Sequence, residues 1–346
     1  MAPVSTTTVA AVADLRAVRR RRRLIVVAGM VLVVLVVGTG ALLIGAAGLT
    51  PGQAIAGALG LGDKGDVFII QMLRLPRVEA AVVVGAAFGL AGALFQATLR
   101  NPLASPDILG ISSGASLGAV IGLLGLGLSG VALSGLAFTG AGVIALAIWL
   151  LAWRKGLHSI RFVLVGVGFA YLCSSLLAWM MARSQEREAA AVLTWTVGSV
   201  SDVRGEQLAL VAAGTLVLLA AVAVVSRTQS PLSLGDDHAR ALGVRVDAAR
   251  VGTLLLAVAL VALATSAAGP IAFVALVAPA IARRLVNDGG AALAASTATG
   301  AALTLVADVV GQHGLLGVAA PVGIVTGLVG APYLLWLLAT NEKRSR

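Results

Sequence analysis

The sequence has few charged residues, one cysteine and three histidines. Charged residues make up 12% of its 346 residues, about half the roughly 25% that is typical of soluble domains. The single cysteine, Cys173, excludes a disulfide framework and a CxxC pair. His158, His238 and His313 lie far apart in the sequence, so no spacing typical of a metal site is present. These shortages argue against a soluble enzyme, a disulfide-stabilised domain and a metal-binding protein.

Acidic residues are missing from the middle of every hydrophobic run. All 15 of them fall between these runs or at their ends. Ion-driven carriers usually keep ionisable groups inside the membrane, so no coupling site for an ion is evident. The sequence also lacks the G-x-x-x-x-G-K-[ST] loop, through which many ATPases bind phosphate. If the protein transports a solute uphill, we expect a partner to supply the energy.

The sequence shows no arrangement of catalytic residues either. Residues 110–114 match the G-x-S-x-G pattern, but that pattern needs a strand-to-helix turn on a sheet, and these residues lie in an apolar run. No cluster of ionisable or metal-binding side chains is visible. We therefore expect no catalytic residue, metal or cofactor in this chain. An ion-coupled secondary carrier and a membrane enzyme are the alternative classes.

Long hydrophobic runs dominate what is present. Hydrophobic residues account for 59% of the chain, and the mean hydropathy is +1.01. A transmembrane helix needs about 20 mostly apolar residues. The expected spans lie within residues 24–48, 80–99, 108–153, 162–182, 207–226, 251–286, 289–307 and 321–340. Two ranges hold two spans each, with a turn near residues 128–134 and a break at Gly269-Pro270. The sequence thus predicts an all-α polytopic membrane protein with about ten transmembrane helices.

The basic residues indicate how these helices are oriented. Ten spans place both termini on one side, and the segments on that side hold 19 of the 25 Lys and Arg residues. The positive-inside rule therefore predicts cytoplasmic termini in the inner cell membrane. The net charge of +10 reflects these loops, and we expect no nucleic-acid partner. Residues 1–23 and 341–346 are predicted tails, the first disordered, and residues 24–340 are the membrane domain.

The predicted spans contain small residues at four-residue spacing. Gly85 and Gly89 form one such pair, and Gly114, Gly118 and Gly122 repeat the spacing in another run. Small residues one helical turn apart let membrane helices approach closely. We therefore expect these glycines to mark contacts between helices.

Two arginines flank a proline at the external start of the second predicted span. Arg74 and Arg77 place two positive charges there, with Pro76 between them. Arginine is well suited to ion pairs at protein interfaces, so the pair is a candidate docking site for an acidic soluble protein. Anchoring of the helix at the membrane surface is the alternative interpretation.

A short cytoplasmic loop is a second candidate segment. Residues 100–106, RNPLASP, contain two prolines and precede a helix of small residues. The prolines make this loop rigid. We interpret it as a gate at the inner mouth of a pathway, with a simple turn as the alternative.

The longest cytoplasmic connection, residues 227–250, is the third candidate. Asp236 or Asp237 is expected to cap a short helix that Gly243 ends. The apolar side of this helix would consist of Leu234, Ala241, Leu242 and Val244. A short helix of mixed polarity is suited to a groove in a soluble partner, and a solvated connector is the alternative.

Several motifs occur in the order found in a known transporter family. They are LRLPR at 73–77, GAAFGLAGALFQ at 85–96, RNPLASPDILGISSGA at 100–115, WTVGS at 195–199, LG at 234–235 with ALGV at 241–244, GPIAFVALVAP at 269–279 with IARR at 281–284, and PVGIVT at 321–326. From about residue 50 to 338 the sequence resembles the FecCD-type permeases of binding-protein-dependent ABC importers. That family carries ferric siderophores, haem or cobalamin.

The resemblance implies an assembly and a role for each candidate segment. It implies two ten-helix permease subunits around a central pathway, two cytoplasmic ATPase subunits that bind ATP and Mg²⁺, and an extracytoplasmic binding protein. On this pattern Arg74 and Arg77 would pair with acidic residues of the binding protein. The cytoplasmic gate would include Asn101, Leu103 and Ser159. The coupling helix in the ATPase would contain Leu234, Gly235, Ala241, Leu242 and Gly243.

The last third of the sequence departs from the family pattern. Gln312 stands where the family often has arginine, and Ala319 and Ala320 stand where a glutamate is usual. Ala280 follows Pro279 where histidine is common. The missing cation and glutamate favour a heterodimer, in which a related second permease supplies what this subunit lacks. The resemblance favours a ferric siderophore as cargo, with cobalamin and haem as alternatives.

Overall fold

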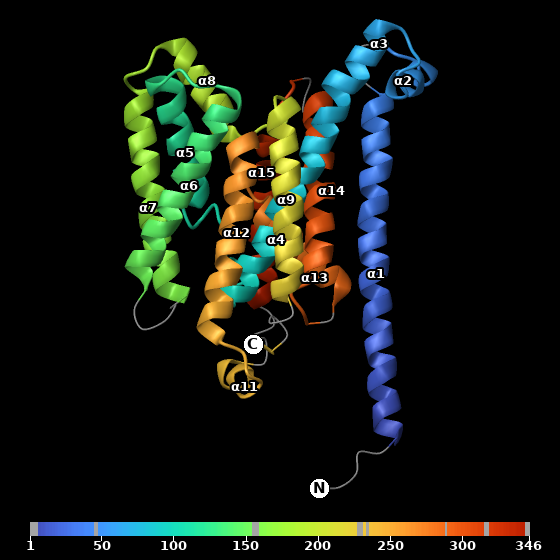
Figure 1. Ribbon diagram of the computed structural model, residues 1–346, viewed down its shortest axis with the longest axis vertical. Coiled ribbons are helices and arrows are strands. Elements are labelled where there is room, and N and C mark those ends of the chain that lie inside the picture. The colour runs from blue at the N-terminus through green and yellow to red at the C-terminus, as the bar shows by residue number, and fades with distance from the viewer. Residues whose placement is uncertain are drawn as a thin grey trace.

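The computed structural model describes residues 6–44, 48–153, 159–226, 231–232, 235–287, 289–314 and 318–342. These residues form helices joined by turns and short loops, with no β-strand among them. The long helices run roughly alongside one another, so that the connections gather at two ends of a bundle (Figure 1).

The helices follow one another with few long connections. The first half of the chain contains α1 (Thr6–Leu43), α2 (Pro51–Ala58), α3 (Lys64–Phe68), the π-helix η1 (Ile69–Arg74), α4 (Leu75–Leu99), α5 (Ile111–Val120), the π-helix η2 (Ile121–Gly125), α6 (Gly130–Ala152) and α7 (Ser159–Met181). The second half contains α8 (Glu186–Val197), α9 (Gly205–Val225), α11 (Asp236–Ala241), α12 (Val246–Ala268), α13 (Val274–Val286), α14 (Leu293–His313) and α15 (Val322–Glu342).

Each predicted span corresponds to a helix. Seven helical stretches of the described residues are long and apolar enough to cross a membrane, and Ile111–Gly125 and Val322–Trp336 are shorter apolar helices. The 13-residue helix α13 completes the expected set. The predicted turn near residues 128–134 lies slightly earlier, at residues 126–129, and Gly269-Pro270 does separate α12 from α13. The prediction of an all-α polytopic membrane protein is confirmed.

Some boundaries differ from the sequence-based expectation. The expected disorder of residues 1–23 is wrong for the described part, because α1 begins at Thr6 and runs unbroken into the first span. Alanine, leucine and arginine all favour helix, so the basic run extends the span. At the other end of the chain, α14 continues past Ala307 to His313. This extension places Asp308 within α14, whereas the sequence predicts that Asp308 lies at the end of a span.

The two ends of the bundle carry different short helices. The N-terminal end of α1 and the short helix α11 lie at one end, and α2, α3 and α8 lie at the other (Figure 1). The positive-inside rule assigns the end with α11 to the cytoplasm. We call this the inner end, and the end with α8 the outer end.

Helix α4 lies at the centre of the bundle, and α1 stands at its edge (Figure 1). In the most apolar 18-residue part of Lys64–Leu99, 72% of the residues are buried. The corresponding part of α1 has 6% of its residues buried. Phe88 and Phe95 of α4 are fully buried. The apolar surface of α1 faces outward instead, as expected for a helix in contact with lipid.

Glycines bring α4 close to α14 and α13. Gly85 and Gly89 lie against the main chain of α14 around Gly300, and Gly92 lies against the main chain of Ala275 in α13. A Cβ atom at any of these three positions of α4 would overlap main-chain or side-chain atoms of the neighbouring helix. The expectation that Gly85 and Gly89 mark a helix contact is confirmed.

Glycines also bring α5 close to α6. Gly114 and Gly118 of α5 face Gly140 of α6, and a Cβ at Gly118 would overlap the carbonyl of Leu136. Because small residues let backbones approach, van der Waals contact replaces the hydrophobic driving force that lipid surroundings remove.

The break between α12 and α13 is held by the segment that follows α8. The N–H of Ser199 donates to the carbonyl of Ala268 at 2.7 Å, and the N–H of Gly323 donates to the carbonyl of Gly198 at 3.2 Å. Residues 198–199 therefore connect the end of α12 with the start of α15. These main-chain bonds satisfy polar groups that the helix break leaves unpaired.

We expect Gly92→Ala to destabilise the protein, because the added methyl group would overlap the main-chain carbonyl of Ala275 between two buried helices. Overpacking of this kind typically costs about 1–3 kcal/mol. Gly142→Ala in α6 is the matched control, since a Cβ there meets open space. Thermal unfolding in detergent should show a lower midpoint for Gly92→Ala only. Equal midpoints for the two variants would contradict the close approach of α4 and α13.

Candidate functional site

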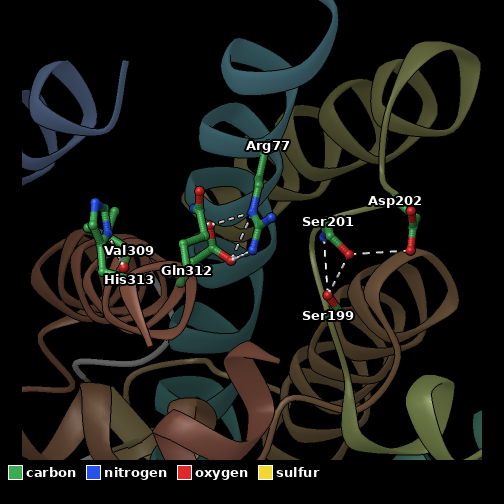
Figure 2. Close-up of polar contacts among 8 residues, drawn as sticks. Arg77, Ser199, Ser201, Asp202, Val309, Gln312 and His313 are labelled. Carbon is green, nitrogen blue, oxygen red and sulfur yellow. Dashed lines mark hydrogen bonds and ion pairs between the residues drawn. The ribbon is translucent and has the colours of Figure 1, made fainter. Parts of the chain in front are cut away.

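Arg77 and Asp308 form an ion pair between α4 and α14 near the outer end. Arg77 Nη2 lies 2.9 Å from Asp308 Oδ1, and Arg77 Nε lies 3.0 Å from Asp308 Oδ2. Gln312, one helical turn after Asp308, donates from Nε2 to Oδ2 at 2.7 Å. Figure 2 shows the guanidinium of Arg77 beside the side chain of Gln312. Both oxygens of the carboxylate are therefore hydrogen-bonded.

The ion pair corrects one expectation about charge. The side chain of Asp308 is 2% exposed and that of Arg77 is 26% exposed, so a carboxylate is buried inside α14 rather than placed beyond its end. A buried carboxylate without a partner is strongly unfavourable, whereas a bidentate arginine compensates much of that cost. The positive charge of Arg77 and the negative charge of Asp308 thus cancel within one hydrogen-bonded pair.

Arg74 has a partner within the chain as well. Its Nη1 donates to the main-chain carbonyl of Leu42 at 2.7 Å, one residue before α1 ends at Leu43. A cation near the last carbonyls of a helix is favourable. Arg74 and Arg77 are both half-buried and hold α4 to α1 and α14. These contacts lie within the chain and test neither anchoring at the membrane surface nor docking of a partner, so both stay predictions.

A cavity of about 800 Å³ opens beside Arg77 at the outer end. Its polar lining comes from Arg77, Thr194, Ser199, Ser201, Gln312 and His313, and Ala319, Ala320 and Pro321 complete one wall. Ser199 and Ser201 share a hydrogen bond of 2.9 Å on the segment that faces Arg77 (Figure 2). Residues that lie far apart in the sequence therefore line one cavity.

The departures from the family pattern meet in this cavity. Gln312, Ala319 and Ala320 line it together with Arg77, although more than 230 residues separate Arg77 from Gln312. The N–H of Ala320 donates to the carbonyl of Gly311 at 3.0 Å. Gln312 is occupied with Asp308, so the residue in place of the usual arginine contributes to the ion pair rather than adding a charge. Ala280, the fourth departure, is buried in α13 and lies apart from this lining.

At the inner end, the loop after α4 is held by local hydrogen bonds. Arg100 has φ 50° and ends α4. Asn101 Oδ1 accepts a bond from the N–H of Leu103 at 2.9 Å, a turn that asparagine forms readily. Ser159 is the first residue of α7, and its side chain lies outside the described part of the structure. The structure places Asn101 and Leu103 in one turn, and their role in a gate is untested.

The far end of this loop is tied to the break between α12 and α13. Asp107 Oδ1 accepts a hydrogen bond from Ser112 Oγ at 2.7 Å, and Ser105 Oγ donates to Asp107 Oδ2 at 3.3 Å. Burial raises the pKa of the Asp107 carboxyl above its usual range, while bonds from Ser112, Ser105 and the Phe273 main chain oppose this shift. Phe273 itself has φ 65° at the start of α13.

Helix α11 projects from the inner end of the bundle (Figure 1). Gly235, with φ 104°, is its N-cap residue, and no side chain caps it. The expectation that Asp236 or Asp237 caps this helix is wrong: both lie in the first turn, where the helix dipole favours an acidic residue. Gly243, with φ 81°, follows the helix as expected, and the N–H of Val244 donates to the carbonyl of Ala239 at 2.9 Å.

The two sides of α11 differ in exposure. Ala239 is buried against Leu232 and Val246, whereas Ala241 is exposed and Leu242 is 63% exposed. Leu234 lies outside the described residues. The exposed side therefore carries an apolar residue at the point where the sequence predicts contact with a soluble partner.

Asp236 joins α11 to two other elements of the inner end. Its Oδ1 lies 2.7 Å from Arg100 Nη2 and 2.7 Å from Arg250 Nη2. Arg100 Nη2 also donates to the carbonyl of Leu232 at 2.9 Å. One carboxylate thus connects the first turn of α11 with the loop after α4 and with the first turn and a half of α12.

Sequence reasoning missed Asp236, Arg100 and Arg250 as a group, as well as Asp308. The available signal was weak: an acidic residue near a span end, and basic residues in loops, which membrane proteins commonly have for orientation alone. The pairing follows from which helices are neighbours in space.

Comparison with known proteins gives matches over most of the chain. The sequence model of the FecCD transport family matches residues 30–340. The chain is 36% identical over 310 residues to the ferric enterobactin transport system permease protein FepG of Escherichia coli (strain K12), which covers 90% of this chain and 94% of that protein. It is 38% identical over 308 residues to the achromobactin transport system permease protein CbrC of Dickeya dadantii (strain 3937), covering 88% of each.

A solved structure shows that the arrangement of helices is shared too. An inward-facing conformation of a metal-chelate type ABC transporter superposes with a TM-score of 0.79 at 25% sequence identity, covering 92% of this chain and 99% of that one. The family match includes both the outer cavity and helix α11. Sequence motifs, helix order and three-dimensional arrangement therefore agree, and the chain belongs to the FecCD transport family.

Proposed function

We propose that this chain is a permease subunit of an ATP-driven ABC importer in the inner cell membrane and that its cargo is a ferric siderophore. The observation that carries the proposal is the family match over residues 30–340. The relatives described above are permease proteins of transport systems, one of them for ferric enterobactin. The name of the ferric enterobactin protein supports an iron chelate as cargo.

A transporter of this kind works with partners. We propose a pair of cytoplasmic ATPase subunits with ATP and Mg²⁺, an extracytoplasmic binding protein and a second permease subunit. The chain has no P-loop of its own, so the energy has to arrive through contact with the ATPase. The chain itself would form one side of the pathway and would carry out no chemical step.

Asp308 is the residue that an ion-coupled carrier would use, because it is a buried carboxylate within a helix. Its two oxygens accept hydrogen bonds from Arg77 and Gln312. An ion would have to displace a bidentate arginine to bind there, which favours an external energy source over ion coupling.

Helix α11 is suited to receive that energy. Its exposed side carries Leu242, which fits an apolar groove in the ATPase, and its first turn carries Asp236. A displacement of α11 would pull on Arg100 and Arg250 through this carboxylate. Because Arg100 directly precedes Asn101, the displacement would reach the proposed gate loop through one residue. The bonds of Asp236 to the two arginines would therefore let a movement of α11 change the position of the proposed gate loop.

The outer cavity is suited to contact the binding protein. The Arg77 side chain is 26% exposed and lines the cavity, so an acidic residue of the partner could reach it, and Arg74 is one helical turn away. Gln312 adds no positive charge to this cavity. We propose that a second, different permease supplies the further cation, which makes the transporter a heterodimer.

Reconstitution tests the assembly and the cargo. Proteoliposomes with this chain, the second permease and the ATPase should accumulate a ferric siderophore only when ATP and the binding protein are present. Omission of the second permease should abolish accumulation, and cobalamin or haem should not be imported. Accumulation by this chain alone would overturn the proposed mechanism, and import of cobalamin or haem in place of the siderophore would overturn the proposed cargo.

Asp236→Asn tests the route from α11. Loss of the charge weakens both arginine contacts, so we expect transport to fall about tenfold or more while membrane insertion and ATPase binding persist. Asp237→Asn is the matched control, because the Asp237 side chain is 96% exposed and pairs with Arg240 of the same helix at 3.2 Å. Transport rates and ATPase activity should be measured for both variants. Equal transport by the two would show that Asp236 does not transmit the movement.

The double variant Arg77→Gln/Asp308→Asn tests docking. It removes the cation without leaving the buried carboxylate unpaired, so the fold should persist. We expect weaker binding of the binding protein to the permease, with a larger loss at low salt, where surface charges are less screened. Arg204→Gln is the control, since this exposed outer arginine pairs only loosely with Asp202 at 3.6 Å. Binding unaffected at any salt concentration would leave Arg77 as an anchor only.

A further inference from the structure

Two helices of the bundle begin directly after buried non-helical segments. Residues 101–110 lead into α5, and residues 269–273 lead into α13. Ser105 and Leu109 are buried in the first segment, and Ile271 is buried in the second. Main-chain polar groups in such segments are shielded from solvent, so they need hydrogen-bond partners within the protein. The partners that these two segments share are therefore important for their positions.

The carboxyl group of Asp107 is such a shared partner. Its Oδ1 accepts a hydrogen bond from Ser112 Oγ at 2.7 Å, in the first turn of α5. The carboxyl group also accepts a bond from the main-chain N–H of Phe273, the N-cap residue of α13. The dipole at the N-terminal end of a helix favours an acceptor oxygen. One side chain thus connects the starts of two helices that lie far apart in the sequence.

The turn that follows Asp107 is packed closely against α7. Gly110, with φ 76°, is the N-cap residue of α5, and a Cβ atom there would lie 2.8 Å from the main-chain nitrogen of Ala170. A Cβ atom at Gly166 would lie 2.9 Å from the carbonyl oxygen of Leu109. Closely packed elements do not deform continuously, so we expect this turn to move together with α7.

Phe273 extends the connection to α15. Its main chain has φ 65°, which is unfavourable for a bulky side chain and persists only where the surroundings hold it. A Cβ atom at Gly330 of α15 would overlap the Cβ and Cγ atoms of Phe273, so the side chain lies directly on α15. The bond to Asp107 and the packing on Gly330 hold this residue from two sides.

We propose that Asp107 is a positioning residue that makes the proposed gate loop and the break between α12 and α13 move as one unit. The inference rests on the proposed function, because the gate role of Asn101 and Leu103 is part of it. The route from α11 described above reaches this loop through Arg100. Asp107 would carry the displacement on to Phe273, so that opening of the inner mouth involves α7, α13 and α15 together.

Helix α5 offers a matched pair of serines for the test. Ser112 and Ser116 lie one helical turn apart and are 4% and 3% exposed. Ser112 Oγ donates to Asp107, whereas Ser116 Oγ donates to the carbonyl of Ser112 within the same helix at 3.1 Å. Ser112→Ala therefore removes a bond between two segments, and Ser116→Ala removes a bond inside one helix.

The connection itself is tested by hydrogen exchange of the full chain in detergent, measured by mass spectrometry. Asp107→Asn replaces one acceptor oxygen with a donor, so we expect exchange to become at least tenfold faster in residues 101–110 and also in residues 269–276. Ser112→Ala should accelerate both segments less, and Ser116→Ala should leave both unchanged. Acceleration of residues 101–110 alone, or an equal effect of Ser116→Ala, would overturn the connection.

The role in transport is tested in proteoliposomes that hold the complete transporter, ATP and the binding protein. We expect Asp107→Asn to lower the amount of ferric siderophore imported per ATP hydrolysed about tenfold, with Ser116→Ala unchanged. A normal ratio in Asp107→Asn would overturn the positioning role. If Asp107→Asn lowers the thermal midpoint, Ser112→Ala decides the question, because it keeps the carboxyl group; a ratio equal to that of Ser116→Ala would then overturn the role.

Failure of the proposed function is distinguishable from failure of this inference. A transporter with the unchanged chain that imports no siderophore would contradict the proposed function. The hydrogen-exchange comparison needs neither cargo nor ATPase, so it would still decide whether Asp107 joins the two segments.

Discussion

The bundle depends on the close approach of α4 to α14. Gly85 and Gly89 allow the backbones to meet at Gly300, and eight residues farther along each helix, toward the outer end, Arg77 reaches Asp308. Larger residues at the crossing would separate the helices, and the guanidinium would lose the carboxylate. Because an unpaired charge is costly at this depth, the packing of small residues and the ion pair support each other. The contact also places Arg77 at the wall of the outer cavity.

The inner end uses charge in another way. The side chain of Asp236 is 28% exposed and binds two arginines from separate elements. Its ion pairs are therefore partly hydrated, and each is weaker than a buried pair. Such contacts suit an element that has to move. The outer pair holds two central helices in a fixed relation, whereas the inner group connects α11, the loop after α4 and α12 by bonds that can be exchanged.

The contacts around the outer cavity give a structural context for three departures from the family pattern. Gln312 hydrogen-bonds to Asp308, and an arginine in its place would bring a second cation to a carboxylate that Arg77 already holds. Ala319 and Ala320 line the same cavity. The three positions therefore change one surface together, which is the surface that we propose meets the binding protein. A second permease with a different set of residues there would make the two halves of the docking surface unequal.

The sequence by itself determined the properties that depend on neighbouring residues. Hydropathy located the spans, Gly269-Pro270 marked a break, and the spacing of Gly85 and Gly89 indicated a contact, because each signal is contained within a few helical turns. The Lys and Arg count predicts the orientation of the spans. The extent of α1, the burial of Asp308 and the role of Asp236 were predicted incorrectly or not at all. Only the tertiary structure decided that Arg77 meets Asp308, 231 positions away, and that Arg100 meets Asp236, 136 positions away. Hydropathy reports only that each span is apolar, so it does not encode which helices become neighbours. That choice depends on how their surfaces fit together.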